Sequence, residues 1–113
     1  MKKFMAVYTG SATPQERAAF QADTATMQKG AAAWGQWMRD HASAIVDTGG
    51  PLGKTKQVDS SGLTDISNQM SAYTIVEAAS HEDAARMFEN HPHFAIFLGK
   101  SVEIMECLPI PGA

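Results

Sequence analysis

Cysteine is nearly absent from this chain, since Cys107 is the only one among 113 residues. A single thiol excludes an internal disulfide, so the fold has to rest on a packed core, and a reducing cytoplasm is the expected compartment. No apolar run approaches the roughly 20 residues that a membrane-spanning helix needs. The apolar segment after Met1 is also too short for a signal peptide. We therefore expect a cytoplasmic protein without a membrane partner.

Basic residues are scarce and scattered. Lys and Arg number 9 against 12 Asp and Glu, which gives a formal net charge of −3. Neutralising nucleic-acid phosphates needs a clustered basic face, so the composition argues against nucleic acid as the main partner. The length suits one compact domain, and such a small domain often hides its remaining apolar surface by dimerising. A single domain over residues 1–113 and a homodimer are expected.

Segments rich in strand formers alternate with two helical patterns. An apolar stripe in steps of four and three residues predicts one long helix, which begins at Pro14 with Thr13 as its cap and runs to His41. A second helix is predicted over His81–Asn90, with Ser80 as its cap. The predicted strands are Lys3–Tyr8, Ala44–Asp47, Ala72–Ala78 and Ser101–Cys107, and Thr55–Val58 is a candidate for one further short strand.

The order of these elements is β-α-β-β-α-β. The polar stretch Asp59–Gln69 predicts an exposed loop, and Pro92 is expected to end the second helix. Two helices on one face of an antiparallel sheet form an α+β sandwich of the ferredoxin-like kind. This fold class is the prediction for the whole chain.

A glycine-rich turn, Thr48–Thr55, resembles a phosphate-binding P-loop. The P-loop pattern needs glycine where Thr48 stands, and it needs a helix directly after its Lys-Thr pair. The residues after Thr55 are β-like instead, so we reject nucleotide binding. Gly50 and Lys54 of this turn remain candidates for lining a small-molecule cleft.

His91 and His93 flank Pro92 and offer two potential metal ligands, with Glu103, Glu106 or Asp47 as candidates to complete a site. Zinc and iron sites need three or four converging ligands, and only two are close here, so we expect no metal and no cofactor. The simpler interpretation is a turn that ends a helix. We retain both histidines as candidate ligand-binding residues.

His41 is the sharpest catalytic candidate, because it ends the apolar stripe of the long helix and should face the sheet or a cleft. A histidine there can act as a general base, and Asp47, at the end of the next strand, can orient it. The alternative is a helix-end histidine bonded to a backbone carbonyl.

The two tryptophans occupy different faces of the predicted helix. Trp34 belongs to the stripe and is expected in the core, whereas Trp37 lies off it and is predicted to line a dimer interface or an aromatic ligand pocket. Cys107 is expected to be buried on the last strand and unreactive, because no basic neighbour is evident.

Several segments together resemble the YCII-related (YCII/DGPF-domain) family. The first strand is similar to the family's opening, and a long helix leading to a short strand and a Gly-Pro turn is similar to its middle. The nearest likeness is at the end of the chain. The matching segments are Lys3–Tyr8, Asp47–Leu52, Ala72–Ser80, Glu82–Ala85, His91-Pro92 and Ser101–Ile104.

That resemblance implies a dimeric α+β barrel, in which two ferredoxin-like sheets pack back to back and enclose clefts. Family members are small bacterial proteins of poorly defined function; some are proposed enzymes with a cleft histidine and aspartate, and others neighbour alternative sigma factors. The Asp-Gly-Pro-Phe motif is here Gly49-Gly50-Pro51-Leu52, so its aspartate is missing. The helix histidine of enzyme-like members falls near Trp34–Trp37, and His41 would have to replace it from a turn later.

Two functions of different classes follow. The first is a dimer that binds a small organic molecule in a cleft and, if catalytic, performs acid–base chemistry with His41 as base and Asp47 orienting it. The second is a non-catalytic accessory or protein-interaction domain, for example one linked to regulation of transcription. Fold alone does not separate them, because such sandwiches host many functions.

Overall fold

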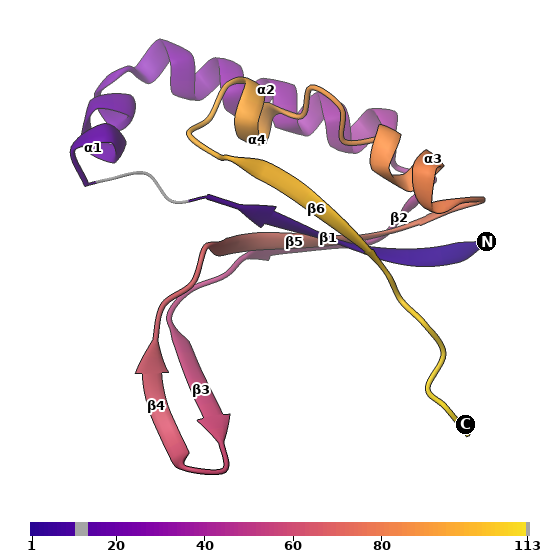
Figure 1. The fold of residues 1–113 in the computed structure, drawn as a ribbon. Coiled ribbons are helices and arrows are strands. Elements are labelled where there is room, and N and C mark those ends of the chain that lie inside the picture. The colour runs from indigo at the N-terminus through magenta and orange to yellow at the C-terminus, as the bar shows by residue number, and fades with distance from the viewer. Residues whose placement is uncertain (11–13, 113) are drawn as a thin grey trace.

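A four-stranded antiparallel sheet carries the described helices on one of its faces (Figure 1). The computed structural model describes residues 1–10 and 14–112, so the predicted cap Thr13 lies outside the described residues. Across the sheet the strands are ordered β2, β5, β1 and β6. Their bounds are Ile45–Pro51 for β2, Met70–Ala78 for β5, Lys2–Thr9 for β1 and Ser101–Glu106 for β6. This order is that of a ferredoxin-like sandwich, which confirms the predicted α+β fold.

The central strand β1 shows why one face of the sheet is covered. Side chains alternate along a strand, and Phe4, Ala6 and Tyr8 point toward the helices, where they are fully buried. Phe4 lies opposite Val76 of β5 in the register, so the core continues across the sheet. Met5, on the other face, lies opposite β5 and β6 residues and stays 36% exposed. We call the side without helices the open face.

The predicted long helix is two helices, and the prediction of one continuous helix was wrong at Asp23. α1 spans Pro14–Ala22 and α2 spans Thr24–Asp40. The Asp23 carboxylate caps α2, because it accepts from the Thr26 backbone amide at 3.2 Å and from the Thr26 hydroxyl at 2.6 Å. A capping Asp satisfies free amides only when a new helix begins after it.

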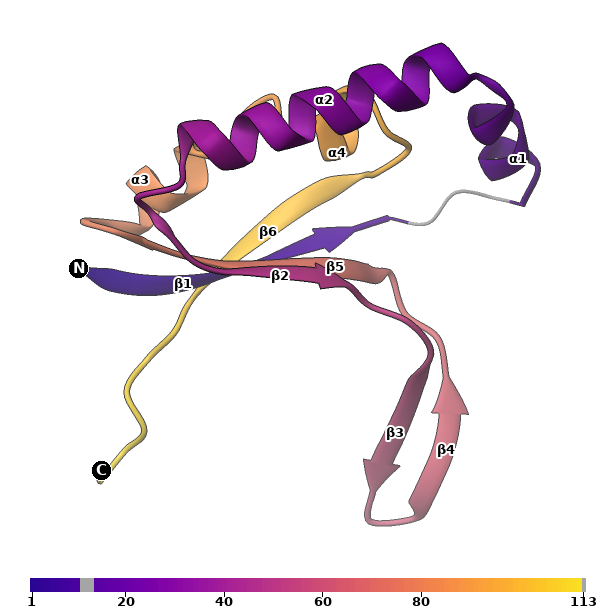
Figure 2. The same cartoon turned by 180° about the vertical axis from the view of Figure 1, so that it is seen from behind.

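The predicted loop Asp59–Gln69 was also wrong. β3 (Thr55–Asp59) and β4 (Gly62–Ile66) pair as a hairpin outside the main sheet, and Figure 2 shows this hairpin projecting away from the helices. The Asp59 carboxylate closes the turn by accepting from the Ser61 amide at 2.8 Å. The turn-forming residues at the tip are also typical of long loops, so the sequence pattern does not reveal the short strands on either side of them.

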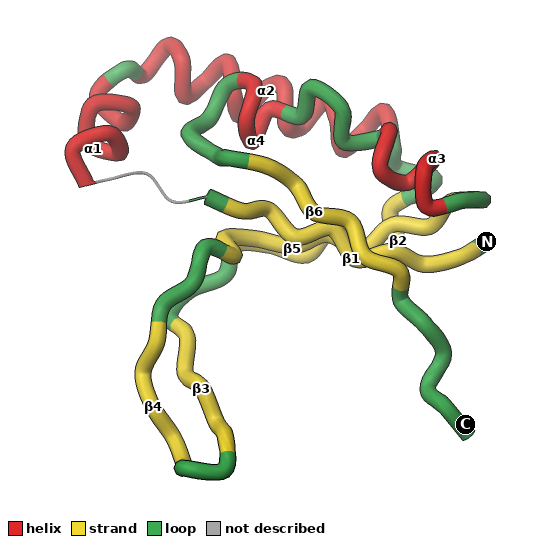
Figure 3. The backbone as a smooth tube through the Cα atoms, viewed as in Figure 1, coloured by secondary structure: helices red, strands yellow, loops and turns green. Residues whose placement is uncertain are grey.

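The second helical region is broken as well. α3 spans His81–Arg86, where the prediction ran to Asn90, and a short α4, Pro92–Ala95, follows it (Figure 3). Pro92 thus begins a helix, at a position that suits proline, and does not end one.

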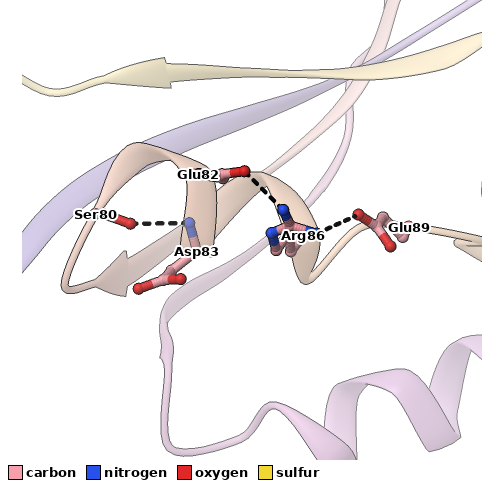
Figure 4. A network of polar contacts seen from close by, with 5 residues as sticks. All are labelled: Ser80, Glu82, Asp83, Arg86 and Glu89. Carbon is pink, nitrogen blue, oxygen red and sulfur yellow. Dashed lines mark hydrogen bonds and ion pairs between the residues drawn. The ribbon is translucent and has the colours of Figure 1, made fainter.

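The start of α3 is as predicted. The Ser80 hydroxyl accepts from the Asp83 amide at 3.1 Å, and Arg86 pairs with Glu82 at 2.7 Å and with Glu89 at 3.6 Å (Figure 4). These contacts are exposed, so they contribute only tenths of a kcal/mol each, on the order of 0.5. Among the described residues no helix is both long and apolar enough to cross a bilayer.

Candidate functional site

Histidines and aromatic rings gather in one cluster between α2 and the sheet. His91 makes ring contacts with Trp34 at 4.6 Å, with Trp37 at 4.8 Å and with Tyr8 at 5.1 Å between centroids. His93 lies 5.2 Å from Tyr8, and both histidines are buried. We call this group the histidine–aromatic cluster; its members are Tyr8, Trp34, Trp37, His41, Phe88, His91 and His93.

The position of the proton on His91 follows from its backbone contacts. His91 caps α4, and its Nδ1 accepts from the His93 backbone amide at 3.0 Å. A neutral imidazole that accepts at one nitrogen carries its proton on the other, so His91 has an Nε2–H group.

That Nε2–H group is completely buried and has no hydrogen-bond partner among the described residues. The ring of Trp34 is perpendicular to His91, at 90°, and that of Trp37 is inclined at 67°. These ring contacts supply no hydrogen-bond acceptor, so the Nε2–H group stays unsatisfied among the described residues.

Burial, together with smaller contributions from the nearby His93 and His41, lowers the pKa of His91 from 6.5 to about 4. The cause is that a charged imidazolium loses its water when buried. His91 is therefore neutral at physiological pH. It serves as a structural and dipolar group in the cluster and does not titrate near neutrality.

The ring of His93 is held in place by contacts with Thr9 and Gly99. Its Nε2 lies 2.8 Å from the carbonyl oxygen of Thr9, which can only accept, so Nε2 donates and neutral His93 keeps its lone pair on Nδ1. Gly99 packs against the same ring, because a Cβ at that position would overlap with the His93 imidazole. The ring is thereby fixed from two sides, as a binding or basic group needs to be.

Tyr8 closes the cluster on the sheet side. Thr74 donates its hydroxyl proton to the Thr48 carbonyl at 3.1 Å, so the Tyr8 hydroxyl donates to Thr74 at 3.1 Å. Burial raises the pKa of Tyr8 above its ordinary 10.0, and the bond to Thr74 opposes that only in part. The phenol therefore stays protonated.

His41 lies at the end of α2 and caps it, as the alternative interpretation had it. Its Nδ1 donates to the Trp37 carbonyl at 2.9 Å, and its ring centroid lies 4.7 Å from that of Trp37. Trp37 itself is buried in the core and donates from Nε1 to the Met87 carbonyl at 2.7 Å, so it does not line an open surface. The structure thus joins Trp37 and His41 to the same cluster as His91 and His93.

The structure does not bring Asp47 to this cluster. Asp47 lies opposite Ile75 in the register, and Ile75 lies opposite Met5, which places Asp47 with the open face. Its carboxylate accepts from the Gly49 amide at 2.8 Å and is exposed. The structure describes both His41 and Asp47 and shows no contact between their side chains.

Gly50 and Lys54 lie farther from the histidines, toward the hairpin. Nothing is within 4 Å of where a Cβ of Gly50 would stand, whereas Gly49 has a φ of +63° and abuts the Tyr73 carbonyl. Lys54 lines a hollow of about 700 Å³ at the base of the hairpin. Its lining mixes polar and charged side chains with the apolar Ile66 and Met70, and it includes none of the clustered rings.

A smaller groove of about 300 Å³ opens onto the histidine–aromatic cluster. His93 lines it at one side, and the apolar wall is formed by Phe20, Met27 and Phe97. Arg17 and Gln21 of α1 add polar groups at its border. A mostly apolar groove with a few fixed polar groups is the usual form of a small-molecule site.

Part of this site was not anticipated from the sequence. The sequence does not point to Tyr8 or Phe97 as functional residues, yet Tyr8 contacts both buried histidines and Phe97 lines the groove. One signal was available: Gly30 approaches the Phe97 ring so closely that a Cβ would stand 2.6 Å from it. A glycine within a helical stripe indicates such close packing. Cys107, expected to be buried, is exposed beyond the end of β6.

The fold and groove define an α+β sandwich with a ligand-sized groove between its helices and sheet. No family model and no protein of curated function matches the sequence. Among solved structures the chain is similar to 5-chloro-2-hydroxyhydroquinone dehydrochlorinase (TftG) from Burkholderia phenoliruptrix AC1100, solved in complex with 2,5-dihydroxybenzoquinone. The identity is 19%, the TM-score is 0.50, and the match covers 92% of this chain and 90% of that one. This likeness supports the fold that the sequence resemblance implied.

Proposed function

We propose that this protein binds a small organic molecule in the groove beside His93. The observation that carries the proposal is that His93 has its Nε2 bonded to the Thr9 carbonyl, so the neutral ring presents an Nδ1 lone pair, and that it lines an apolar groove. A fixed acceptor in apolar surroundings orients a ligand hydroxyl, since buried polar groups need partners. Membership of the YCII-related family is part of the same proposal.

The ligand class is a planar ring with hydroxyl or carbonyl substituents. Phe20 and Phe97 pack with their centroids 5.4 Å apart and offer aromatic surface, while Arg17, Gln21 and His93 offer polar contacts. The neighbour of similar fold was solved with 2,5-dihydroxybenzoquinone, which belongs to this class.

If the protein is catalytic, acid–base chemistry on that ring is the reaction we propose. His93 would be the base, because its Nδ1 lone pair is free to take a proton from a ligand hydroxyl while Nε2 stays bonded to Thr9. The pair His41 and Asp47 remains a prediction from the sequence. The geometry favours His93 over that pair, because Asp47 lies with the other face of the sheet.

We further propose a cytoplasmic homodimer. The open face carries an apolar centre, with Met5 36% and Met105 43% exposed and in register with each other. A sheet with one uncovered apolar face is expected to pack against another layer. The rival function, a protein-interaction domain, is favoured by the exposed apolar side chains of the hairpin, Val58 and Leu63.

The test is to titrate the protein with 2,5-dihydroxybenzoquinone and follow the backbone and aromatic NMR signals. We expect shifts at Phe20, Phe97 and His93, and loss of affinity of at least tenfold in His93→Gln, whose amide can still donate to Thr9. The matched control is His41→Ala, which should bind as the wild type does.

Shifts centred on His41 and Asp47 would move the site to the residues predicted from the sequence. Saturating amounts of the quinone without any shift would overturn the proposed ligand class. Equal affinity of His93→Gln and the wild type would remove His93 from the site.

A further inference from the structure

The chain has too much surface for a monomer of its size. A folded monomer of 12.1 kDa is expected to expose roughly 6,000 Å², whereas this chain exposes 7744 Å². Its radius of gyration is 16.0 Å, against about 13 Å for a compact chain of this length. The excess of roughly 1,700 Å² is about twice the ~800 Å² that one partner buries in a standard interface.

Two projecting segments contribute to this excess, and both carry exposed apolar side chains. One is the β3–β4 hairpin, where Val58 is 76% and Leu63 64% exposed. The other is the C-terminal segment of residues 107–112, where Leu108 is 74% and Ile110 76% exposed. An isolated two-stranded hairpin is only marginally stable in water, so a hairpin with exposed aliphatic side chains is expected to pack against something.

Both segments project to the same side of the sheet, from its opposite ends. Figures 1 and 2 show the hairpin descending from one end of the open face and the C-terminal segment from the other, with the helices on the far side. The exposed side chains of Met5 and Met105 lie on the sheet between them. Exposed apolar side chains on the hairpin, the sheet and the C-terminal segment therefore all lie on the open side of the molecule.

A second copy of the chain fits this region by symmetry. A two-fold axis between two facing sheets, at right angles to the long direction of the open face, exchanges the two ends of that face. Each hairpin then comes to lie beside the other copy's C-terminal segment. A five-residue hairpin reaches about 17 Å, and facing sheets pack about 10 Å apart, so the hairpin is long enough to pass the other sheet.

We propose that two copies pack by their open faces and that the β3–β4 hairpin of each copy packs against residues 107–112 of the other. In this arrangement the hairpin tip, near Leu63, meets the start of the segment at Cys107, and the hairpin base meets Ile110. The contact rests on the proposed homodimer and not on the proposed ligand groove. Closed two-fold contacts of this kind are the commonest in oligomers.

Cross-linking tests the contact without disturbing the fold. Cysteine is placed singly at Val58, Ser60 or Leu63, and each protein, which retains Cys107, is oxidised mildly. A disulfide needs its Cα atoms within about 7 Å. We expect at least one variant to give a covalent dimer, with the new cysteine linked to Cys107 in peptide mass spectra. The same variant carrying Cys107→Ser should give none.

Introducing a pair of opposite charges across the proposed contact tests the same contact by double-mutant analysis. Leu63→Lys and Leu108→Asp, at the hairpin tip and at the start of the C-terminal segment, should each weaken dimerisation at least tenfold in sedimentation equilibrium. If the two effects were independent, their changes in the free energy of dimerisation would add. The double variant should dimerise at least fivefold more tightly than that sum predicts, because the introduced charges attract each other across the contact. Ala32→Asp, an exposed position on the outer side of α2, is the control and should dimerise as the wild type does.

The outcomes separate the proposals. A monomeric wild type at high micromolar concentration would overturn the homodimer and the contact together. A dimer in which no tip cysteine links to Cys107, and in which the charge variants do not couple, would overturn the contact alone. Neither result bears on the quinone titration, because the groove lies within one copy.

Discussion

The two faces of the sheet differ in how completely their side chains are buried. On the helix side, Phe4, Tyr8 and Val76 are at most 1% exposed, and glycines at 30 and 99 let neighbouring rings approach. On the open side, Met5 and Met105 retain more than a third of their surface, and the hairpin and C-terminal segment stand away from the sheet.

This difference shows where the chain completes its own structure and where it leaves the structure to a partner. The covered face holds the buried histidines and the groove, so its chemistry is set within one copy. The open face holds exposed apolar surface at Met5 and Met105, which suits association better than chemistry. Changes on the covered face should therefore cost stability or ligand binding, and changes on the open side should mainly affect assembly.

The largest effect is expected where packing is tightest. Gly99→Ala places a methyl group on the His93 imidazole and should lower the free energy of unfolding by about 3 kcal/mol. The control is Gly53→Ala at the base of the hairpin, where nothing lies within 4 Å. It should change stability by less than about 0.5 kcal/mol. Urea unfolding measures both, and equal losses would contradict the contrast between the two sides.

Lowering the pH should reduce the free energy of unfolding, because His91 on the covered face resists protonation in the folded state. The unfolded chain binds a proton near pH 6.5, whereas folded His91 does so only near pH 4. Above pH 6.5 both states are neutral and the stability is fully present. As pH falls from 6.5 to 4, the unfolded state gains the proton first, and the free energy of unfolding drops by up to about 3 kcal/mol.

The measurement is urea unfolding at pH 7.5 and pH 4.5 for the wild type and for His91→Phe. The variant is less stable at pH 7.5, since the His93 amide loses its acceptor, but it should lose about 2 to 3 kcal/mol less than the wild type on acidification. The carboxylates titrate in both proteins, so the difference isolates His91. The same pH dependence in both would contradict the assignment.

The fold was predictable because it rests on local patterns. Strand alternation at Lys3–Tyr8 and Ala72–Ala78, and the Ser80 cap, each appear in a few consecutive residues. The errors occurred where a polar residue is compatible with two different structural roles. Asp23 fits the helical pattern but caps α2, and Ser60-Ser61 are typical of a loop but form the turn of a hairpin.

The site was less predictable, because it is assembled from distant parts of the chain. Tyr8 meets His91 across 83 positions, and His93 bonds Thr9 across 84, and no local pattern encodes these contacts. His91 and His93 were singled out for being near one another, but their roles depend on the elements that bury them. The proposed pairing of His41 with Asp47 used proximity in sequence, whereas the sheet separates them onto different faces.

The smallest predicted effect compares two tyrosines on neighbouring strands. Tyr8 lies on the covered face and donates to Thr74, so Tyr8→Phe should cost about 1 kcal/mol, the usual net value of one hydrogen bond. Tyr73 lies opposite Val7, toward the open face, and its hydroxyl has no hydrogen bond among the described residues. Tyr73→Phe should therefore change the stability of the monomer by less than about 0.5 kcal/mol. Thermal and urea unfolding of both variants at low protein concentration, where association is weak, gives the comparison, and a larger loss in Tyr73→Phe would show that the open face is ordered by polar contacts.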